Sequence, residues 1–196
     1  PMLSLACWMR ARVLGDEVLH AGAFVGEGGA WLVVGDREAG KSTLLAQLHL
    51  LGVPIVTDDL SVLRGGRVFA GPRCIDLRPD MATRLGTGSL VRSGTRFREQ
   101  LPPIEAEHRV AGFIELGSSE SDGLERVRGS ARLARLLAVT EERSRRPPAD
   151  LLDLACLPYC RLNRRLDPAA PGDATELLQM LPMLSVAGVS GAGSRR

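Results

Sequence analysis

The sequence is poor in aromatic residues, in net charge and in long apolar runs. Aromatic side chains account for only 4% of the 196 residues, which argues against a platform on which nucleobases stack. The net charge is +2, with acidic and basic residues interspersed, so the basic stripe typical of nucleic-acid-binding domains is missing. The apolar runs are shorter than a membrane-spanning helix, and the first residues do not form a signal-peptide pattern. We therefore expect neither nucleic acid nor a membrane among the partners.

Cysteines are also few, and they are scattered. Cys156 and Cys160 are spaced C-x-x-x-C, but no histidine or second cysteine pair stands nearby to complete a zinc site. Reduced thiols, and with them a cytoplasmic location, are the expectation. The length and the hydrophobic fraction of 44% suit one domain with its own core. We assign that domain to residues 1–184 and expect a flexible tail over residues 185–196, which are mostly Gly, Ser, Ala and Arg.

The only lysine in the chain, Lys41, belongs to a glycine loop. The segment Gly35-Asp36-Arg37-Glu38-Ala39-Gly40-Lys41-Ser42 fits the pattern G-x-x-x-x-G-K-[ST] at every fixed position. The apolar run 31–34 precedes it as a candidate strand, and a helix is expected over residues 43–51, closed by Gly52. A second apolar run, 53–56, leads into the acidic pair Asp58-Asp59. Strand, loop and helix in this order are the context that a phosphate-binding loop requires.

The residue types of this loop suit a nucleotide. Its glycines allow backbone N–H groups to point at a phosphate chain, and the following helix directs its positive N-terminal end at the same anion. We expect Lys41 to reach the terminal phosphates and the Ser42 hydroxyl to ligate Mg²⁺. Because arginine is used at every other strongly basic position, the single lysine indicates a site that needs a compact point charge. The expected cofactors are ATP and Mg²⁺, and the expected nucleotide-binding residues are Gly35, Asp36, Arg37, Glu38, Ala39, Gly40, Lys41, Ser42 and Thr43.

The rest of the sequence predicts an α/β fold with a mixed β-sheet and flanking helices. Residues 11–14 and 17–25 are expected to form a hairpin around Gly15-Asp16, so that the glycine loop follows a β-meander. Residues 87–108 are rich in Gly, Ser, Arg and Pro, and we expect a long mobile loop there that becomes ordered over an acceptor. Further strands are expected at 60–63, 67–70, 73–79, 110–116 and 160–162, and helices at 80–87, 130–138, 149–155 and 175–181.

Four segments occur in the order found in HPr kinase/phosphorylase, a family that the chain resembles. They are residues 20–25, the glycine loop, Asp58-Asp59 and Asp76-Leu77-Arg78. In that family a histidine-bearing strand, a G-D-S-G-x-G-K-S loop, an A-D-D segment and an E-I-R-G segment follow one another. The resemblance is strongest over residues 17–79 and implies a P-loop kinase core of HPr-kinase type. The short chain also resembles HPr-kinase-like enzymes of peptide natural-product clusters, including lasso-peptide pathways, which phosphorylate a serine of a precursor peptide.

The resemblance implies a role for each matching side chain. Asp58 would be the base beside the acceptor hydroxyl, with His20 close to it, and Arg78 would stabilise phosphate charge. Together with Lys41, these are the catalytic candidates. The metal would be served by Ser42, Asp59 and Asp76.

The chain also departs from the family pattern. Arg37 and Glu38 replace a serine and a glycine of the loop, which makes the loop bulkier. Asp76 replaces a glutamate, and Pro79 replaces a glycine. The glycine-rich stretch that the family uses in the reverse, phosphorolytic reaction is absent, so the resemblance does not extend to that reaction.

Each candidate residue also has a purely structural interpretation. His20 can be a core histidine, Asp58-Asp59 a turn or helix cap, and Asp76 with Arg78 the solvent side of a strand. The functional interpretation is a Mg²⁺-ATP-dependent kinase that transfers the γ-phosphoryl group to a serine hydroxyl of a peptide or protein, with a lasso precursor peptide as one candidate acceptor. A small-molecule kinase and a non-catalytic nucleotide-binding switch are the alternatives, and a homo-oligomer is left open.

Overall fold

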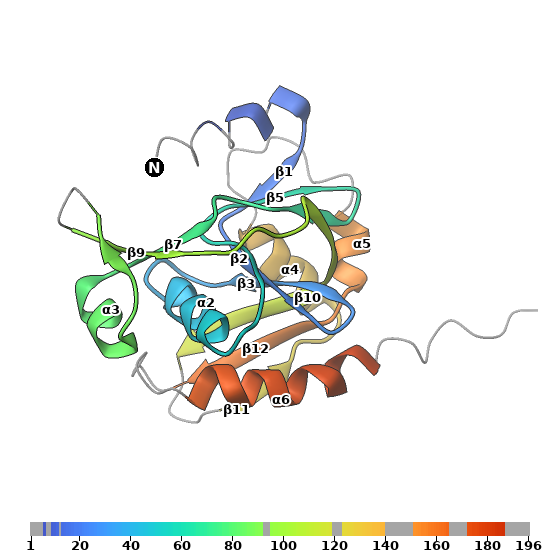
Figure 1. Cartoon of the computed structure of the whole chain (residues 1–196). Helices are drawn as coiled ribbons and strands as arrows, with labels where there is room; N and C mark the ends of the chain where they lie inside the picture. The colour runs from blue at the N-terminus through green and yellow to red at the C-terminus, as the bar shows by residue number, and fades with distance from the viewer. Residues whose placement is uncertain are drawn as a thin grey trace, which may run out of the picture.

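The protein folds around one large mixed β-sheet. A computed structural model describes residues 6, 9–11, 13–91, 95–118, 123–139, 151–164 and 172–186. The large sheet has helices on both faces, and a smaller sheet lies beside it (Figure 1). The predicted α/β class with a mixed sheet and flanking helices is therefore confirmed. None of the helices among these residues is both long enough and apolar enough to cross a membrane.

The strand order of the large sheet is β1-β5-β6-β10-β3-β2-β4, with β12 paired to β10 and β11 paired to β12. Its strands are β1 (Glu17–Leu19), β2 (Gly22–Gly26), β3 (Gly29–Val34), β4 (Ile55–Thr57), β5 (Ser61–Arg64), β6 (Arg67–Phe69), β10 (Glu107–Ser118), β11 (Gly123–Arg126) and β12 (Tyr159–Arg164). The small sheet, in the order β7-β9-β8, contains β7 (Cys74–Leu77), β8 (Ser89–Leu90) and β9 (Phe97–Gln100). The helices are α2 (Lys41–Leu50), α3 (Pro79–Leu85), α4 (Ser130–Val139), α5 (Leu151–Cys156) and α6 (Gly172–Val186).

Strand direction brings three distant segments to one edge of the sheet. Strand β2 runs antiparallel to both β3 and β4, while β10 runs parallel to β3. The strands β3, β4 and β10 therefore end at the same edge, and β2 begins there. The glycine loop after β3, the acidic pair after β4 and His20 before β2 all lie at this edge. The sequence placed the acidic pair on the strand next to the loop strand, but β2 stands between β3 and β4.

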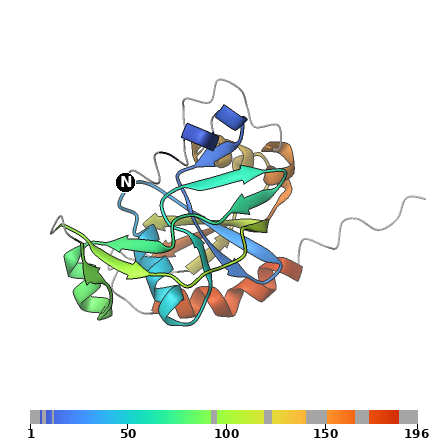
Figure 2. The ribbon, with the colours of Figure 1, turned by 45° about the horizontal axis from the view of Figure 1, so that its top comes forward.

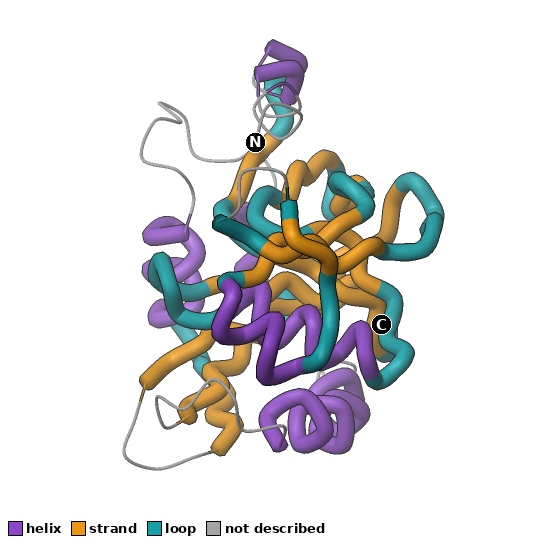
Figure 3. Tube along the Cα trace, turned by 60° about the vertical axis from the view of Figure 1, so that its left-hand side comes forward, coloured by secondary structure: helices purple, strands orange, loops and turns teal. Residues whose placement is uncertain are grey.

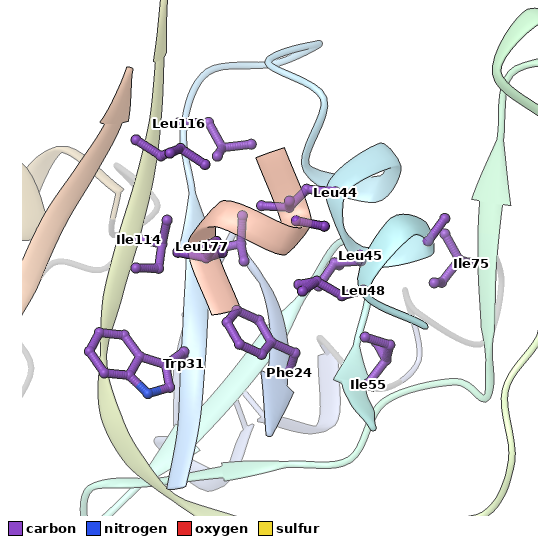
Figure 4. Close-up of a cluster of buried hydrophobic side chains, with 14 of the residues drawn as sticks. Phe24, Trp31, Leu44, Leu45, Leu48, Ile55, Ile75, Ile114, Leu116 and Leu177 are labelled. Carbon is purple, nitrogen blue, oxygen red and sulfur yellow. The ribbon is translucent and has the colours of Figure 1, made fainter. Parts of the chain in front are cut away.

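Alternating side chains of the sheet form two hydrophobic layers. In β3, Trp31 and Val33 belong to one layer, whereas Leu32 and Val34 belong to the other. The first layer is covered by α2 and α6, which contribute Leu44, Leu45, Leu48, Leu177 and Leu181 (Figure 4). The second layer is covered by α4 and α5 through Leu136 and Leu154. Helices accordingly lie on either side of the central strands (Figure 3).

Helix α2 packs closely on the sheet at Gly22. A Cβ at this position would lie 2.3 Å from Leu45 Cδ1 and 3.3 Å from the carbonyl oxygen of Thr57. Only a residue without a side chain lets the helix and the end of β4 approach β2 at the same point. This packing fixes the N-terminus of α2 over the edge where the candidate residues lie.

The N-terminal hairpin prediction is wrong. Residues 9–11 and 13–14 are helical, and Gly15 ends this segment with a φ of 75°. The amide of Asp16 donates to the carbonyl oxygen of Ala11 at 2.9 Å, a bond that closes a helix end rather than a hairpin. Residues 17–25 then form two strands, because the chain bends at His20 between β1 and β2. A short apolar run cannot be assigned to a strand or a helix by periodicity alone.

The expected mobile loop over residues 87–108 contains regular structure instead. Strands β8 and β9 lie within it and pair with each other, and β9 also pairs with β7. Residues 92–94, including Arg92, lie outside the described residues. Strand β11 was not expected, and α6 extends through Val186, two residues into the predicted tail, while residues 187–196 are not described. The remaining predicted elements occur with boundaries shifted by a few residues.

Candidate active site

One cavity, of about 550 Å³, brings together segments that are far apart in the sequence. It is lined by loop residues Arg37, Glu38, Gly40 and Thr43, whereas Gly35, Asp36 and Ala39 are not among its lining residues. The strand-end segments and the smaller sheet complete the wall. All seven side chains predicted as catalytic or metal-binding line this cavity: His20, Lys41, Ser42, Asp58, Asp59, Asp76 and Arg78.

The glycine loop curls around the ammonium group of Lys41. Gly35 and Gly40 have φ values of 144° and 86°, a region that glycine enters without steric strain. The Lys41 ammonium donates to the carbonyl oxygens of Gly35 at 2.9 Å and Asp36 at 3.0 Å. Burial lowers the pKa of Lys41, and the negative charges of Asp59, Asp58 and Asp36 oppose that shift. Since α2 has no side-chain cap at Gly40, its first N–H groups can serve an anion.

Glu38 is the strained residue of the loop. Its φ is 69°, a left-handed conformation that costs a residue with a Cβ about 1–2 kcal/mol. The family pattern has glycine at this position, which is consistent with the backbone found here. The Glu38 carboxylate accepts a hydrogen bond from Arg78 Nη2, although both side chains are more than half exposed. Arg78 is therefore at the cavity but is engaged by an acid of the loop.

Asp58 contacts Ser42. The Ser42 hydroxyl donates to Asp58 Oδ1 at 2.8 Å, which links the start of α2 to the end of β4. Burial raises the pKa of Asp58 to about 6, and the charges of Asp59 and Asp76 act in the same direction. The hydrogen bonds from the Ser42 hydroxyl and the Asp76 amide partly offset the effect. Asp58 is thus a carboxylate of unusually high basicity beside the predicted magnesium-binding serine.

Asp59 points away from this contact. Its φ of 72° turns the chain, and the Thr57 hydroxyl supports the turn by donating to the carbonyl oxygen of Leu60 at 2.9 Å. As a result, Asp59 Oδ1 lies 3.5 Å from His20 Nδ1, with the two side chains 61% and 45% exposed. The adjacent acids thus face different partners, and the histidine predicted to lie near the base is paired with Asp59. A left-handed aspartate at such a position is typical of strain held at a functional site.

Asp76 is held by an arginine of the neighbouring strand. Arg98 lies opposite it in the β7–β9 pair, and the guanidinium donates to both carboxylate oxygens at 2.7 and 2.8 Å. These hydrogen bonds hold the pKa of Asp76 below its usual value. Both oxygens of this predicted metal ligand are consequently engaged by Arg98.

The donor set suits a cation that is only partly bound by protein. The described residues contain no group of three or more His, Cys, Asp or Glu side chains that could hold a metal ion. Mg²⁺ commonly takes one or two protein ligands, with water and phosphate oxygens completing its shell. A serine hydroxyl beside a carboxylate, as in Ser42 and Asp58, fits that requirement. Of the three predicted metal residues, only Ser42 is in this contact, because Asp59 faces His20 and Asp76 faces Arg98.

Two arginines at the site were not assigned from the sequence. Arg73 donates to the carbonyl oxygens of Ile55, Val56 and Pro102 at 2.7 to 3.0 Å, and so fastens the exposed edge of β4 just before the acidic pair. Nothing in its sequence neighbourhood indicates this role. Arg96 lines the cavity; its place in an arginine-bearing segment was noticed, but a solvated loop was the preferred interpretation.

No protein-family model matches the chain, and no curated protein matches its sequence. Among solved structures, it is similar to the HPr(Ser) kinase/phosphatase from Coxiella burnetii, with 15% sequence identity and a TM-score of 0.49. That alignment covers 90% of this chain and 96% of that chain. At this identity the similarity concerns the fold alone.

Proposed function

We propose that the protein is a Mg²⁺-ATP-dependent kinase that phosphorylates a serine hydroxyl of a peptide or protein. The observation that carries this proposal is the single cavity in which the phosphate-binding loop, its lysine, two strand-end acids and an arginine meet. A nucleotide-binding switch needs the loop and a metal contact, but it does not need a second acid of raised pKa. The excess of acid–base groups over binding groups favours catalysis.

Binding of the nucleotide is assigned to the loop and α2. The N–H groups of the loop and the uncapped start of α2 would surround the phosphates, and Lys41 would exchange its carbonyl partners for phosphate oxygens. Arg78 would do the same with its Glu38 partner. Bound Mg²⁺ would neutralise charge on the transferring phosphoryl group. Ser42 would be its protein ligand, with Asp59 and Asp76 on the same cavity wall.

Asp58 is assigned the role of general base. When the Ser42 hydroxyl turns to the metal, Asp58 keeps a carboxylate that can accept the proton of the acceptor hydroxyl. The seryl oxygen then forms a bond to the γ-phosphorus while the bond from phosphorus to the β,γ-bridging oxygen breaks, and ADP leaves with that electron pair. A base with a pKa of about 6 is mostly ionised at neutral pH yet more basic than an ordinary carboxylate, which suits this task. His20 would orient Asp59.

The acceptor is the least constrained part of the proposal. The resemblance described from the sequence makes a serine of a natural-product precursor peptide, including lasso precursors, a candidate. Incubation with labelled ATP and candidate peptides, followed by mass spectrometry, would locate the phosphate. A label found only on small alcohols would replace the peptide acceptor with a small-molecule one.

The two acids provide the sharpest test. Asp58→Asn keeps the shape of the side chain and removes its proton-accepting charge, so we expect near-normal Mg²⁺-ATP binding and loss of transfer by at least about two orders of magnitude. Asp59→Asn should weaken both binding and transfer. If calorimetry shows that Asp58→Asn abolishes Mg²⁺-ATP binding while Asp59→Asn binds normally but is inactive, the two roles are exchanged. Full transfer activity in both variants would contradict the kinase mechanism.

A further inference from the structure

A second pocket, of about 480 Å³, lies on the other side of Asp58. Asp58 is the single residue that lines both this pocket and the nucleotide cavity. The other walls come mainly from apolar residues of β5, β6 and the N-terminal helical segment, among them Leu14, Leu60, Val62 and Phe69. Figure 2 shows the turns of that segment beside β5 and β6. We call this site the apolar pocket.

The apolar pocket opens at the end of the cavity where an acceptor would attack. Asp58 contacts Ser42, the residue after Lys41, and these two residues are the ones assigned to the terminal phosphates and their metal. The nucleoside would extend away from this point, beyond Thr43, because the phosphate chain follows the loop into the helix. A group in the apolar pocket would therefore meet the carboxylate of Asp58 from the side opposite the nucleotide.

The walls of the apolar pocket are fixed. Arg64 donates to both oxygens of Asp16 at 2.5 and 2.7 Å, and its guanidinium stacks 5.5 Å from the centre of the Phe69 ring. These contacts tie the β5–β6 hairpin to the start of β1. Gly71 packs against Thr57, since a Cβ there would lie 2.0 Å from Thr57 Oγ1. The floor is thereby joined to the turn that carries Asp58.

Charge at the rim narrows the choice of occupant. Asp16 is already paired with Arg64, whereas Arg10 has no ion-pair partner among the described residues and also lines the pocket. An acidic group on the occupant would complement Arg10. The volume is within the range of pockets that bind sizeable ligands, and it is larger than the hydroxymethyl group of a serine requires.

On the basis of the proposed kinase function, we propose that the apolar pocket receives an aliphatic side chain adjacent to the acceptor serine of a peptide, with an acidic residue nearby that pairs with Arg10. The serine hydroxyl then lies at Asp58, where the pocket and the cavity meet. Peptides with leucine, isoleucine or valine next to the serine are thus the preferred class of acceptor, and small alcohols without such a group are poor acceptors.

The test uses the full chain, Mg²⁺-ATP and a pool of synthetic peptides with one fixed serine and randomised neighbours. We expect aliphatic residues to be enriched beside the phosphorylated serine. Leu14→Gln alters a pocket residue that is 52% exposed, and Leu137→Gln makes the same change at a 48% exposed leucine of α4 that lines neither site. Val62→Thr keeps a β-branched shape in β5 and adds a hydroxyl to the wall.

Leu14→Gln and Val62→Thr should each lower kcat/KM for an aliphatic-flanked peptide by about tenfold, while the Kd for Mg²⁺-ADP and the activity of Leu137→Gln remain at the parent values. Absence of enrichment, or equal kinetics in all three variants, overturns the inference. Weaker Mg²⁺-ADP binding in the pocket variants also overturns it, because the pocket would then belong to the nucleotide.

Failure of the parent to phosphorylate any peptide refutes the aliphatic-peptide inference as well. Two further readouts then decide whether the kinase function fails with it. Transfer to glycerol or free serine would retain a kinase and replace its acceptor class. A parent that transfers phosphate to no acceptor and does not bind Mg²⁺-ATP in calorimetry would contradict the kinase function itself.

Discussion

Replacing Asp58 with asparagine should make the protein more stable in the absence of Mg²⁺ and nucleotide. Burial and the nearby charges of Asp59 and Asp76 raise the pKa of Asp58 from 3.8 to about 6. The folded protein therefore binds this proton more tightly than the unfolded chain does. Stability is highest when Asp58 is protonated, falls as the pH rises from about 4 to about 6, and stays low above that range.

The pKa shift sets the size of the effect. At about 1.4 kcal/mol for each pKa unit, a rise from 3.8 to about 6 corresponds to at most about 3 kcal/mol of lost stability at pH 8. Asparagine has no charge to desolvate, and its side-chain oxygen can still accept the hydrogen bond from Ser42. Asp58→Asn should therefore gain about 1–3 kcal/mol at pH 8, or roughly 2–10 °C in Tm for a domain of this size, and about half of that gain at pH 5.

The assay is thermal and urea unfolding of parent and variant at pH 5 and pH 8 with a chelator present. Asp16→Asn is the matched control, because Asp16 has a buried carboxylate that is already paired with Arg64, and its loss should destabilise the protein. A lower Tm for Asp58→Asn at pH 8, or a gain that does not change with pH, would refute the reasoning. Such a result would mean that Asp58 is stabilised in the folded protein as a charged group.

Three further outcomes are expected. Lys41→Ala and Lys41→Arg should lower the transfer rate by at least about two orders of magnitude, and an amine-reactive ATP analogue should label Lys41 unless excess Mg²⁺-ATP protects it; labelling that ATP does not reduce would reject the assignment. Glu38→Gln removes the acid that engages Arg78, so the Kd for Mg²⁺-ATP should fall about two- to tenfold in calorimetry, and an unchanged Kd would exclude Arg78 from phosphate binding. Gly71→Ala places a Cβ 2.0 Å from Thr57 Oγ1 and should lower the free energy of unfolding in urea by about 1–3 kcal/mol, whereas unchanged stability would show that the turn moves without cost.

Local motifs in this chain were predictable because their physics is local. The glycine loop and α2 follow from residues within one short segment, whose glycines, lysine and serine have few alternative uses in that order. The β5–β6 hairpin was equally clear, since Gly65-Gly66 supplies the positive φ values of 56° and 70° that a two-residue turn requires. The resemblance to a kinase family added the side chains that line the far wall of the cavity.

Features that depend on pairing between distant strands were not predictable. The segment before residue 107 looked like a loop because its composition is polar, yet Arg98 pairs with Asp76 across β9 and β7 and gives it an ordered partner. The position of β2 between β3 and β4 is a property of the sheet and not of any segment. The contact of Ser42 with Asp58 rather than Asp59 results from a left-handed backbone at Asp59, which no local pattern specifies.

Every charged group expected to contact the phosphates or the metal is held by another group of the chain. Lys41 is bound by loop carbonyls, Arg78 by Glu38, and Asp76 by Arg98. Binding of Mg²⁺-ATP must therefore exchange partners, and the affinity equals the difference between two sets of similar contacts. Exposed pairs such as Arg78 with Glu38 are weak and should exchange readily, whereas the two-hydrogen-bond pair of Asp76 with Arg98 is joined across strands and should persist. On this argument Asp76 acts mainly by fastening the small sheet beside the cavity, and Ser42, Asp58 and Lys41 form the part of the site that responds to the nucleotide.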